Sequence, residues 1–216
     1  MLKLVAILLL GYFLGGIPFG LLIGRLTRGI DVRQYGSGRI GFANVLRTCG
    51  VKAGLLTFTA DVGKGVVAVL AGRFIFGGGV EMLWGMPVDS QVAQAVAGVA
   101  AIIGHCWSPY IRFDGGRGVD PALGGLFAMV PWAGAGCLAV GWAVILSTRY
   151  VSLGSMLGTF SSVVILAPFA ALGQQPPEFV IYGALATAIV VFKHRENIQR
   201  LLSGTERRLG EKGERR

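Results

Sequence analysis

Residues 4–24, LVAILLLGYFLGGIPFGLLIG, contain no charged side chain. A helix of this length crosses the hydrocarbon core of a bilayer, because each residue adds about 1.5 Å to a helix. The run is longer than the apolar part of a cleaved signal peptide and has no small-residue cleavage site, so we interpret it as a membrane span. Its glycines recur at four-residue spacing, which permits close contact with another helix, and Pro18 predicts a kink.

The composition of the whole chain agrees with a protein that sits in lipid. Of 216 residues, 53% are hydrophobic and only 14% are charged. In lipid only helices and closed barrels satisfy the backbone, and these apolar runs are too long for barrel strands. We therefore predict an all-α, polytopic integral membrane bundle. The net charge of +9 lies in loops and the tail, where it attracts the anionic lipid bilayer surface, and no interleaved aromatic and basic pattern favours nucleic acid as a partner.

Six further helices are expected after the first. They cover residues 51–72, 91–110, 119–130, 132–146, 153–171 and 179–192. The segment 25–52 carries six basic residues against Asp31 alone, so the positive-inside rule places it in the cytoplasm and the N-terminus outside. A break at Pro131 keeps the C-terminus cytoplasmic too. The prediction is seven helices, some too short to cross alone, in one transmembrane domain over 1–203 with a charged, solvated cytoplasmic tail over 204–216.

Three polar clusters fall on the predicted cytoplasmic side. The first is residues 35–49, YGSGRIGFANVLRTC, which we expect to be a short loop. Glycines let backbone N–H groups converge on phosphate oxygens, and Arg47 could clamp the same oxygens. The alternative is a basic loop that flanks the membrane. The glycines also fit the dinucleotide fingerprint, which requires a strand and a parallel sheet that this sequence does not offer.

The second cluster joins His105 to the glycine run of residues 114–118, DGGRG, which suits phosphate. Alone, His105 is more often a hydrogen-bonded structural histidine than a base. The third cluster is residues 193–200, KHRENIQR, where a continuing helix places His194 and Asn197 on one face. Its alternative is a juxtamembrane basic helix on anionic lipid.

Two further features of the sequence concern the interior. The span 51–72 contains Asp61 and Lys64 one turn apart, and ionisable groups at such depth indicate a site, a water-filled cavity or a structural pair. The cysteines are far apart and include no C-x-x-C, so neither a disulfide framework nor a zinc site is indicated. They are Cys49, Cys106 and Cys137.

Together these motifs resemble the PlsY family, bacterial integral-membrane acyltransferases that acylate glycerol 3-phosphate from acyl phosphate. The matching residues follow the family's order over nearly the whole chain: Gly36-Ser37-Gly38, Gly41, Asn44–Arg47, Gly50, Asp61, Lys64-Gly65, Gly104-His105, Phe113, Gly115–Val119, Thr148–Tyr150, Ser152, His194-Arg195, Asn197-Ile198, Arg200-Leu201 and Gly204–Glu206. The resemblance implies a multi-pass protein of the bacterial inner membrane with seven helices, an outside N-terminus and a cytoplasmic active site.

The resemblance also implies the chemistry. Acyl phosphate is already activated, so the protein must bind two anions and neutralise charge while the glycerol hydroxyl attacks and inorganic phosphate leaves. The departing phosphate or the substrate's own phosphate could accept the proton, and no metal or coenzyme is required. By resemblance the catalytic residues are Ser37, Asn44, Arg47, His105, Arg117 and Asn197. Substrate binding falls to Gly36, Gly38, Gly41, Lys64, Gly115, Gly116, Gly118, Ser152 and His194.

Two motifs depart from the family pattern. The usual GSGNIGATN reads GSGRIGFAN, and the usual KGGKGVAT reads DGGRGVDP, which introduces Arg39, Phe42, Ala43, Asp114, Arg117, Asp120 and Pro121. Charge is rearranged around the donor site, so an altered specificity or an inactive paralogue is one alternative. Another is a transporter or binding protein for an anionic lipid precursor. All polar clusters lie on one face and no inverted repeat is found, which favours the enzyme.

Overall fold

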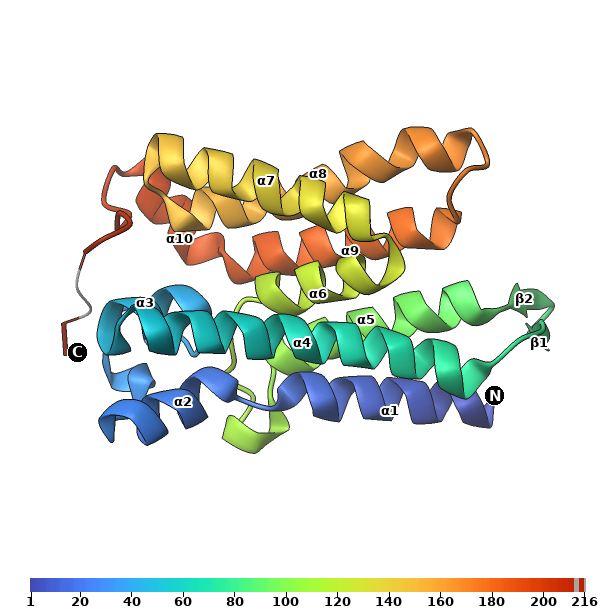
Figure 1. Ribbon diagram of the computed structural model, residues 1–216, viewed down its shortest axis with the longest axis horizontal. Helices are drawn as coiled ribbons and strands as arrows, with labels where there is room; N and C mark the ends of the chain where they lie inside the picture. The colour runs from blue at the N-terminus through green and yellow to red at the C-terminus, as the bar shows by residue number, and fades with distance from the viewer. Residues whose placement is uncertain (212–213, 216) are drawn as a thin grey trace.

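The computed structural model describes residues 1–211 and 214–215, which form a bundle of helices lying roughly along one axis (Figure 1). The longer helices are α1 (Leu2–Gly16), α2 (Phe19–Arg28), α4 (Val51–Phe76), α5 (Ser90–Cys106), α7 (Pro131–Thr148), α8 (Val151–Ala171) and α9 (Pro177–Lys193). The shorter ones are α3 (Phe42–Cys49), α6 (Val119–Met129), α10 (Arg195–Leu202) and the 3-10 turns η1 (Val32–Gln34) and η2 (Pro109–Ile111). Each of the seven stretches expected to span or enter the membrane contains a helix, although the expected span 91–110 is regular α-helix only to Cys106 and the first stretch is interrupted at residues 17 and 18.

Five helical segments of the described chain are long and apolar enough to cross a membrane, with α1 and α2 counted as one. The count rises to six if α9 and α10, which meet at a bend of 62°, form one span. The membrane-protein class is thereby confirmed. The number of crossings and the side on which each terminus lies stay predictions.

The helices form two groups with α6 between them (Figure 1). In one group α1 packs on α5 and α4, and in the other α8 packs between α7 and α9. Helix α6 contacts α4, and α5 contacts α9, so these pairs join the groups. Small residues allow the close approach: a Cβ added at Gly11 of α1 would lie 2.7 Å from the carbonyl oxygen of Ala97 in α5.

Prolines break the helices where the sequence predicts. Helix α1 ends at Gly16 and α2 begins at Phe19, so the kink falls at Pro18. Likewise α6 ends at Met129 and α7 begins with Pro131, which stands at the first helical position, where its missing N–H costs nothing. The long apolar stretch after residue 119 is therefore two helices.

Two local expectations were wrong. The stretch 35–49 is a loop only to Gly41, because the residues after it form amphipathic α3, whose Val45 is fully buried. Residues 193–200 do not continue α9, since the chain bends at His194 before α10. Between α4 and α5 the chain forms a hairpin of β1 (Glu81–Leu83) and β2 (Met86–Val88). Its turn residues Trp84 and Gly85 both have positive φ, as a tight two-residue hairpin turn needs.

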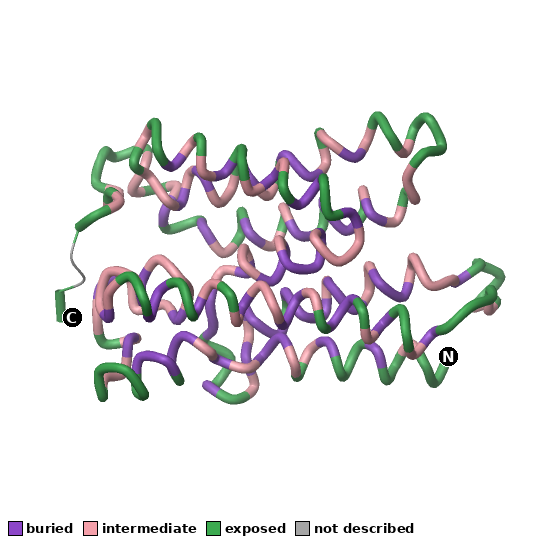
Figure 2. The backbone as a smooth tube through the Cα atoms, in the orientation of Figure 1, coloured by how far each residue is buried: buried purple, intermediate pink, exposed green. Residues whose placement is uncertain are grey.

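The pattern of burial fits a bundle in lipid (Figure 2). The main core lies where α5, α6, α7, α8 and α9 meet, around the fully buried Leu166 and Tyr182. The Tyr182 hydroxyl donates to the Ala122 carbonyl oxygen at 2.8 Å, which satisfies its one polar group. Large apolar side chains face outward along the helices, as lipid contact allows; examples are Leu9, Phe13, Leu70, Phe160 and Val164.

Candidate functional site

A polar cleft with an empty volume of about 600 Å³ lies where the three polar clusters meet. We call it the polar cleft. Its lining comes from all three clusters, the start of α6, the start of α8 and the tail. The lining residues are Ser37, Arg39, Gly41, Phe42, Ala43, Asn44, Arg47, His105, Arg117, Gly118, Val119, Asp120, Val151, Ser152, Ser155, His194 and Glu206. The fold thus brings together residues more than a hundred positions apart. Of the expected site residues, Gly36, Gly38, Lys64, Gly115, Gly116 and Asn197 lie outside this lining.

Asn44 holds the glycine-rich loop from inside. It is only 2% exposed. Its Oδ1 accepts from the Ser37 N–H at 2.9 Å, and its Nδ2 donates to the carbonyl oxygens of Arg39 and Val32, both at 2.8 Å. The amide therefore has its partners within the protein. Asn44 shapes the loop that carries Ser37, and its side chain has little capacity left for a substrate.

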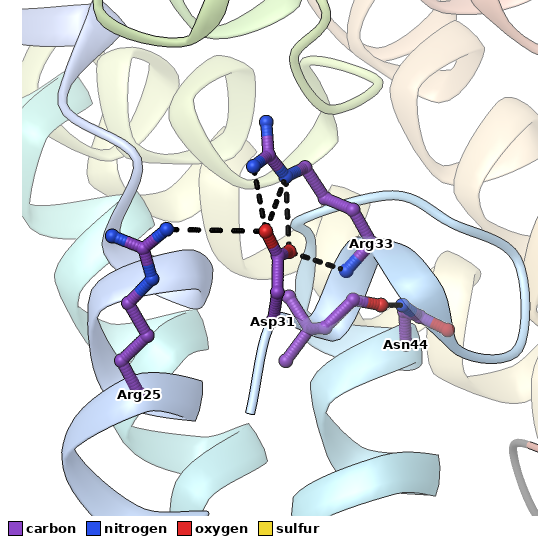
Figure 3. Close-up of polar contacts among 5 residues, drawn as sticks. Arg25, Asp31, Arg33 and Asn44 are labelled. Atoms are coloured by element: carbon purple, nitrogen blue, oxygen red, sulfur yellow. Dashed lines mark hydrogen bonds and ion pairs between the residues drawn. The ribbon is translucent and has the colours of Figure 1, made fainter. Parts of the chain in front are cut away.

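An ion cluster fixes the turn before this loop. Figure 3 shows the guanidinium groups of Arg25, on α2, and Arg33 on two sides of the Asp31 carboxylate. Arg33 Nη2 lies 2.6 Å and Arg25 Nη2 3.9 Å from Asp31 Oδ2. The side-chain hydrogen bond from Arg33 holds the pKa of Asp31 below its usual value. This cluster ties the end of α2 to the first polar cluster.

Two arginines supply cationic groups to the cleft. Among the described residues, neither Arg47 nor Arg117 forms a side-chain ion pair, and the buried Nε of Arg117 has no hydrogen-bond partner. Burial, with a smaller contribution from Arg39, lowers the pKa of Arg117 to about 10. Burial and Arg207 lower the pKa of Arg47. Both groups still carry their charge at neutral pH, so the cleft offers two cations to an anion.

His105 reaches the cleft from α5 and is held from behind by α4. Its Nδ1 lies 2.8 Å from Lys64 Nζ, which also donates to the Ile17 carbonyl oxygen at 3.0 Å and lies 2.7 Å from Asp61 Oδ1. The contact with Asp61 is an ion pair without hydrogen-bond geometry, because neither oxygen of the Asp61 carboxylate has a hydrogen-bond partner among the described residues. Nδ1 of His105 faces the donor group of Lys64 and is therefore the acceptor of that pair. His105 is then neutral with its proton on Nε2. We call Asp61, Lys64 and His105 the buried triad.

The triad changes the role expected for Lys64. Its side chain is 1% exposed and bound to protein groups, so it supports His105 and does not reach the cleft. The His105 ring explains why residue 116 is a glycine, because a Cβ at Gly116 would collide with that ring. Gly118, which lines the cleft, has φ +83° and begins α6. Gly116 therefore leaves room for the His105 ring, and Gly118 allows the left-handed backbone turn before α6.

His194 lines the cleft from the bend between α9 and α10. Its Nδ1 lies 2.8 Å from the Val190 carbonyl oxygen. A carbonyl can only accept, so Nδ1 carries the proton and Nε2 is an acceptor in the neutral ring. The two histidines thus differ in role: Nε2 of His105 is a hydrogen-bond donor, whereas Nε2 of His194 is an acceptor.

The tail contributes a residue that sequence reasoning missed. Glu206 accepts from Ser152 Oγ at 2.8 Å, Asn197 Nδ2 at 2.6 Å and Arg200 Nε at 2.7 Å. Burial alone would raise its pKa, but these hydrogen bonds hold the pKa below its usual value. Glu206 therefore forms hydrogen bonds with Ser152, expected to bind substrate, and with Asn197, expected to be catalytic. The only sequence signal for a role of Glu206 was its place at the end of the family motif. The tail, which was expected to be solvated, is in contact with the site at this residue.

At the mouth of the cleft, Arg39 joins the first two clusters. Its Nη1 lies 2.6 Å from Asp114 Oδ1, and its Nη2 lies 3.7 Å from Glu196 Oε1 on α10. The two departures at Arg39 and Asp114 thus form one ion pair. Arg39 does not replace the charge missing at position 114, because Asp114 neutralises it.

An apolar groove leads away from the polar cleft between α6 and the α7–α8 pair. Its empty volume is about 690 Å³. The lining is almost wholly apolar and includes Phe58, Leu123, Leu126, Leu138, Trp142, Ile145 and Ala186. It shares Phe42, Val119, Asp120, Val151 and Ser155 with the polar cleft. A ligand with an anionic head and a long apolar tail would fit both at once.

Comparison with known proteins identifies the family. The model of the glycerol-3-phosphate acyltransferase family matches residues 5–204. The chain belongs to this family. A glycerol-3-phosphate acyltransferase of Rubrobacter xylanophilus is 43% identical over 207 residues, or 95% of each chain. A second, from Dehalococcoides mccartyi strain 195, is 39% identical over 97% of each chain. The protein is therefore an acyltransferase.

Two crystal structures of PlsY, an integral membrane glycerol 3-phosphate acyltransferase, resemble the present acyltransferase. The glycerol 3-phosphate form matches with a TM-score of 0.82 at 33% identity over 96% of each chain. The lysophosphatidic acid form matches with a TM-score of 0.81 at 32% identity, over 96% of this chain and 95% of that one. The resemblance to PlsY and the integral-membrane fold are confirmed.

Proposed function

We propose that this acyltransferase moves an acyl group from acyl phosphate to glycerol 3-phosphate and releases lysophosphatidic acid and inorganic phosphate. The observation that carries the proposal is the junction of the polar cleft with the apolar groove. Acyl phosphate has a phosphate next to a long chain, and the cleft and groove have that order. Of the two PlsY structures, one is a glycerol 3-phosphate form and the other a lysophosphatidic acid form, which supports the same acceptor and product.

The cleft supports a division of roles. Arg47 and Arg117 form no ion pair within residues 1–211 and 214–215, so their charges suit two phosphate groups, and a guanidinium binds a phosphate through two parallel hydrogen bonds. Ser37, held at the rim by the Asn44 amide, lies in the same lining as Arg47. The Nε2 of His194 can accept a hydrogen bond from a glycerol hydroxyl. We assign Ser37, Arg47 and His194 to the acceptor and Arg117 to the donor phosphate.

The donor's identity can be tested directly. Purified protein in liposomes should convert acyl phosphate and radiolabelled glycerol 3-phosphate into lysophosphatidic acid and an equal amount of inorganic phosphate. Acyl-coenzyme A, which presents a thioester and a much larger head group, serves as the control donor and should give far less product. Product from acyl-coenzyme A alone would overturn the donor assignment. Uptake of glycerol 3-phosphate without product would favour a transporter.

We further propose that the cleft faces the cytoplasm of the bacterial inner membrane. Single cysteines at Ser37, Asp114 and Glu196, which are partly or largely exposed, in a background without the three native cysteines, should react with an impermeant thiol reagent only from the cytoplasmic side. One at Asp89, at the other end of the bundle, should react only from outside. Labelling of position 196 from outside would reverse the topology and the side of the site.

A further inference from the structure

Another cluster of arginines lies at the break between α1 and α2, in a groove that shares no residue with the polar cleft. We call it the basic groove. Its empty volume is about 1360 Å³. Its lining combines apolar residues of the break with η2 and three arginines, and it includes no acidic residue. The lining residues are Ile17, Pro18, Leu21, Leu22, Arg25, Arg33, Tyr110, Ile111 and Arg112.

Along α2 the wall of the basic groove changes from apolar to basic. Residues 4–24 carry no charge, and Arg25 is the first charged residue after them. Leu21, Leu22 and Arg25 share one face of the helix, because residues three and four positions apart are neighbours on a helix surface. Basic residues at the end of an apolar span lie at the level of the lipid headgroups. The groove thus leads from the hydrocarbon to the headgroup layer.

Two of the three arginines have charge to offer a ligand. Figure 3 shows Arg25 and Arg33 on two sides of the Asp31 carboxylate. Arg33 Nη2 donates to Asp31 Oδ2 at 2.6 Å, whereas Arg25 Nη2 lies 3.9 Å from the same atom and its side chain is 59% exposed. Arg112 forms no ion pair within residues 1–211 and 214–215. Arg33 is therefore a structural partner of Asp31, and Arg25 and Arg112 are available.

The turn that carries Arg112 is fixed against α1. Arg112 and Phe113 have φ of +57° and +61°, a conformation that residues other than glycine seldom adopt and that is often found at ligand sites. The Phe113 N–H donates to the Ser108 carbonyl at 2.8 Å, and Ser108 Oγ donates to the Gly16 carbonyl at 2.6 Å. These bonds hold the unusual turn, with Arg112, beside the α1–α2 break.

The chemistry of the groove matches an anionic phospholipid. Guanidinium groups bind phosphate oxygens through parallel hydrogen bonds, and an acyl chain needs an apolar wall that continues into the hydrocarbon. Leu22 is 42% exposed and provides such a wall, and Tyr110, which is 55% exposed, has the ring and hydroxyl that are enriched at membrane interfaces. A free phosphate would contact the arginines but would leave the apolar wall uncovered.

We propose that the basic groove binds an anionic phospholipid of the surrounding bilayer, with its phosphate on Arg25 and Arg112 and an acyl chain along Leu22 and Tyr110. This lipid joins α2 to the turn after η2, which the chain itself connects only through the long segment between them. The site is separate from the polar cleft and does not depend on the proposed reaction.

Native mass spectrometry of the full-length protein in detergent tests the site, with dioleoyl phosphatidylglycerol as the anionic probe. An arginine near an anionic headgroup contributes about fivefold to binding, so Arg25→Gln and Arg112→Gln should each weaken probe binding about fivefold, and the double variant about twenty-fivefold. At a probe concentration that saturates wild type, the double variant should retain one molecule fewer. Unchanged binding in the double variant would overturn the proposal.

A matched control separates the groove from a general attraction by positive charge. Arg28→Gln removes an exposed charge from the same end of α2, outside the groove lining, and should bind the probe as wild type does. A loss equal to that of the double variant would show only general attraction and would overturn the proposal. Equal binding of dioleoyl phosphatidylcholine, which has no net charge, would overturn it too.

Two further measurements locate the lipid and identify it. In an Arg117→Ala background, the substitutions of Arg25 and Arg112 should still remove one probe molecule. No loss there would place the probe in the polar cleft and overturn the proposal. Glycerophosphoglycerol, which is the same headgroup without acyl chains, should not displace the probe even at millimolar concentration. Displacement would make the groove a site for a soluble phosphate and would overturn the lipid assignment.

Discussion

The polar cleft and the buried triad both place charges inside the protein, but they balance them differently. In the triad, Lys64 meets Asp61, His105 and the Ile17 carbonyl, so its charge is satisfied within the chain. In the cleft, Arg47 and Arg117 form no ion pairs among the described residues. A desolvated charge without a partner is costly. The comparison indicates that the triad stabilises the fold, whereas the cleft is completed by an anionic ligand.

The largest effect should come from breaking the triad. Lys64→Met leaves the Asp61 carboxylate buried and unpaired, which should lower the free energy of unfolding by about 3–5 kcal/mol. Thermal unfolding of the detergent-purified protein measures the loss. The double variant Asp61→Asn with Lys64→Met removes both charges and should recover most of it. A double variant no more stable than Lys64→Met would contradict the structural role of the pair.

The next effect tests the cleft at its donor side. Arg117→Ala should lower kcat by on the order of a hundredfold or more, because it removes a preorganised charge that stabilises the departing phosphate. Unfolding should change little, in contrast to Lys64→Met. Arg117→Lys keeps the charge and should retain much of the activity. Full activity in Arg117→Ala would keep the enzyme but discard this account of its donor site.

A smaller effect is expected at the acceptor side. A charged hydrogen bond contributes about 1.5–3 kcal/mol, so Arg47→Ala should raise the apparent KM for glycerol 3-phosphate by roughly ten- to a hundredfold. Arg47→Lys should recover only part, because an ammonium lacks the planar fork. Steady-state kinetics with each substrate varied in turn provides the measurement. Unchanged constants for both substrates in Arg47→Ala would remove Arg47 from the site.

The smallest effect should come from the ion pair at the mouth. The Asp114 side chain is 61% exposed, and exposed pairs contribute roughly 0.2–1 kcal/mol. Asp114→Asn should therefore change kcat/KM by less than about fivefold at low salt. Assays at rising ionic strength should reduce even this difference, because salt screens exposed charges. A difference that grows with salt would show that the pair acts by another route.

The helical membrane class and the two helix breaks could be predicted from the sequence, because they depend on composition and on the fixed backbone angle of proline. The apolar runs require helices in lipid, and Pro18 and Pro131 break them wherever the tertiary contacts lie. It could not predict α3, because the glycines before it resemble a loop, whereas the helix is stabilised by burying Val45 against the core.

The roles of individual site residues depended on partners that sequence spacing does not reveal. Lys64 meets His105 across 41 positions and Ile17 across 47, so its removal from the cleft could not be foreseen. Likewise, the spacing did not reveal that the Asn44 side chain donates to the carbonyl oxygens of Val32 and Arg39. Glu206 lies in a segment whose charge indicated solvent, yet three hydrogen bonds bring it into the site.

The corner between α6 and α7 shows how a short helix can end at membrane depth. A chain that turns at membrane depth usually exposes unpaired backbone donors to hydrocarbon. Here Val130 is 2% exposed, its N–H donates to the Leu126 carbonyl, and its own carbonyl accepts from Ala133 and Gly134. Pro131 adds no donor at all. The corner thus satisfies the backbone N–H and carbonyl of Val130 within the protein. Helix α6 ends after 11 residues, a length of about half the thickness of the hydrocarbon core.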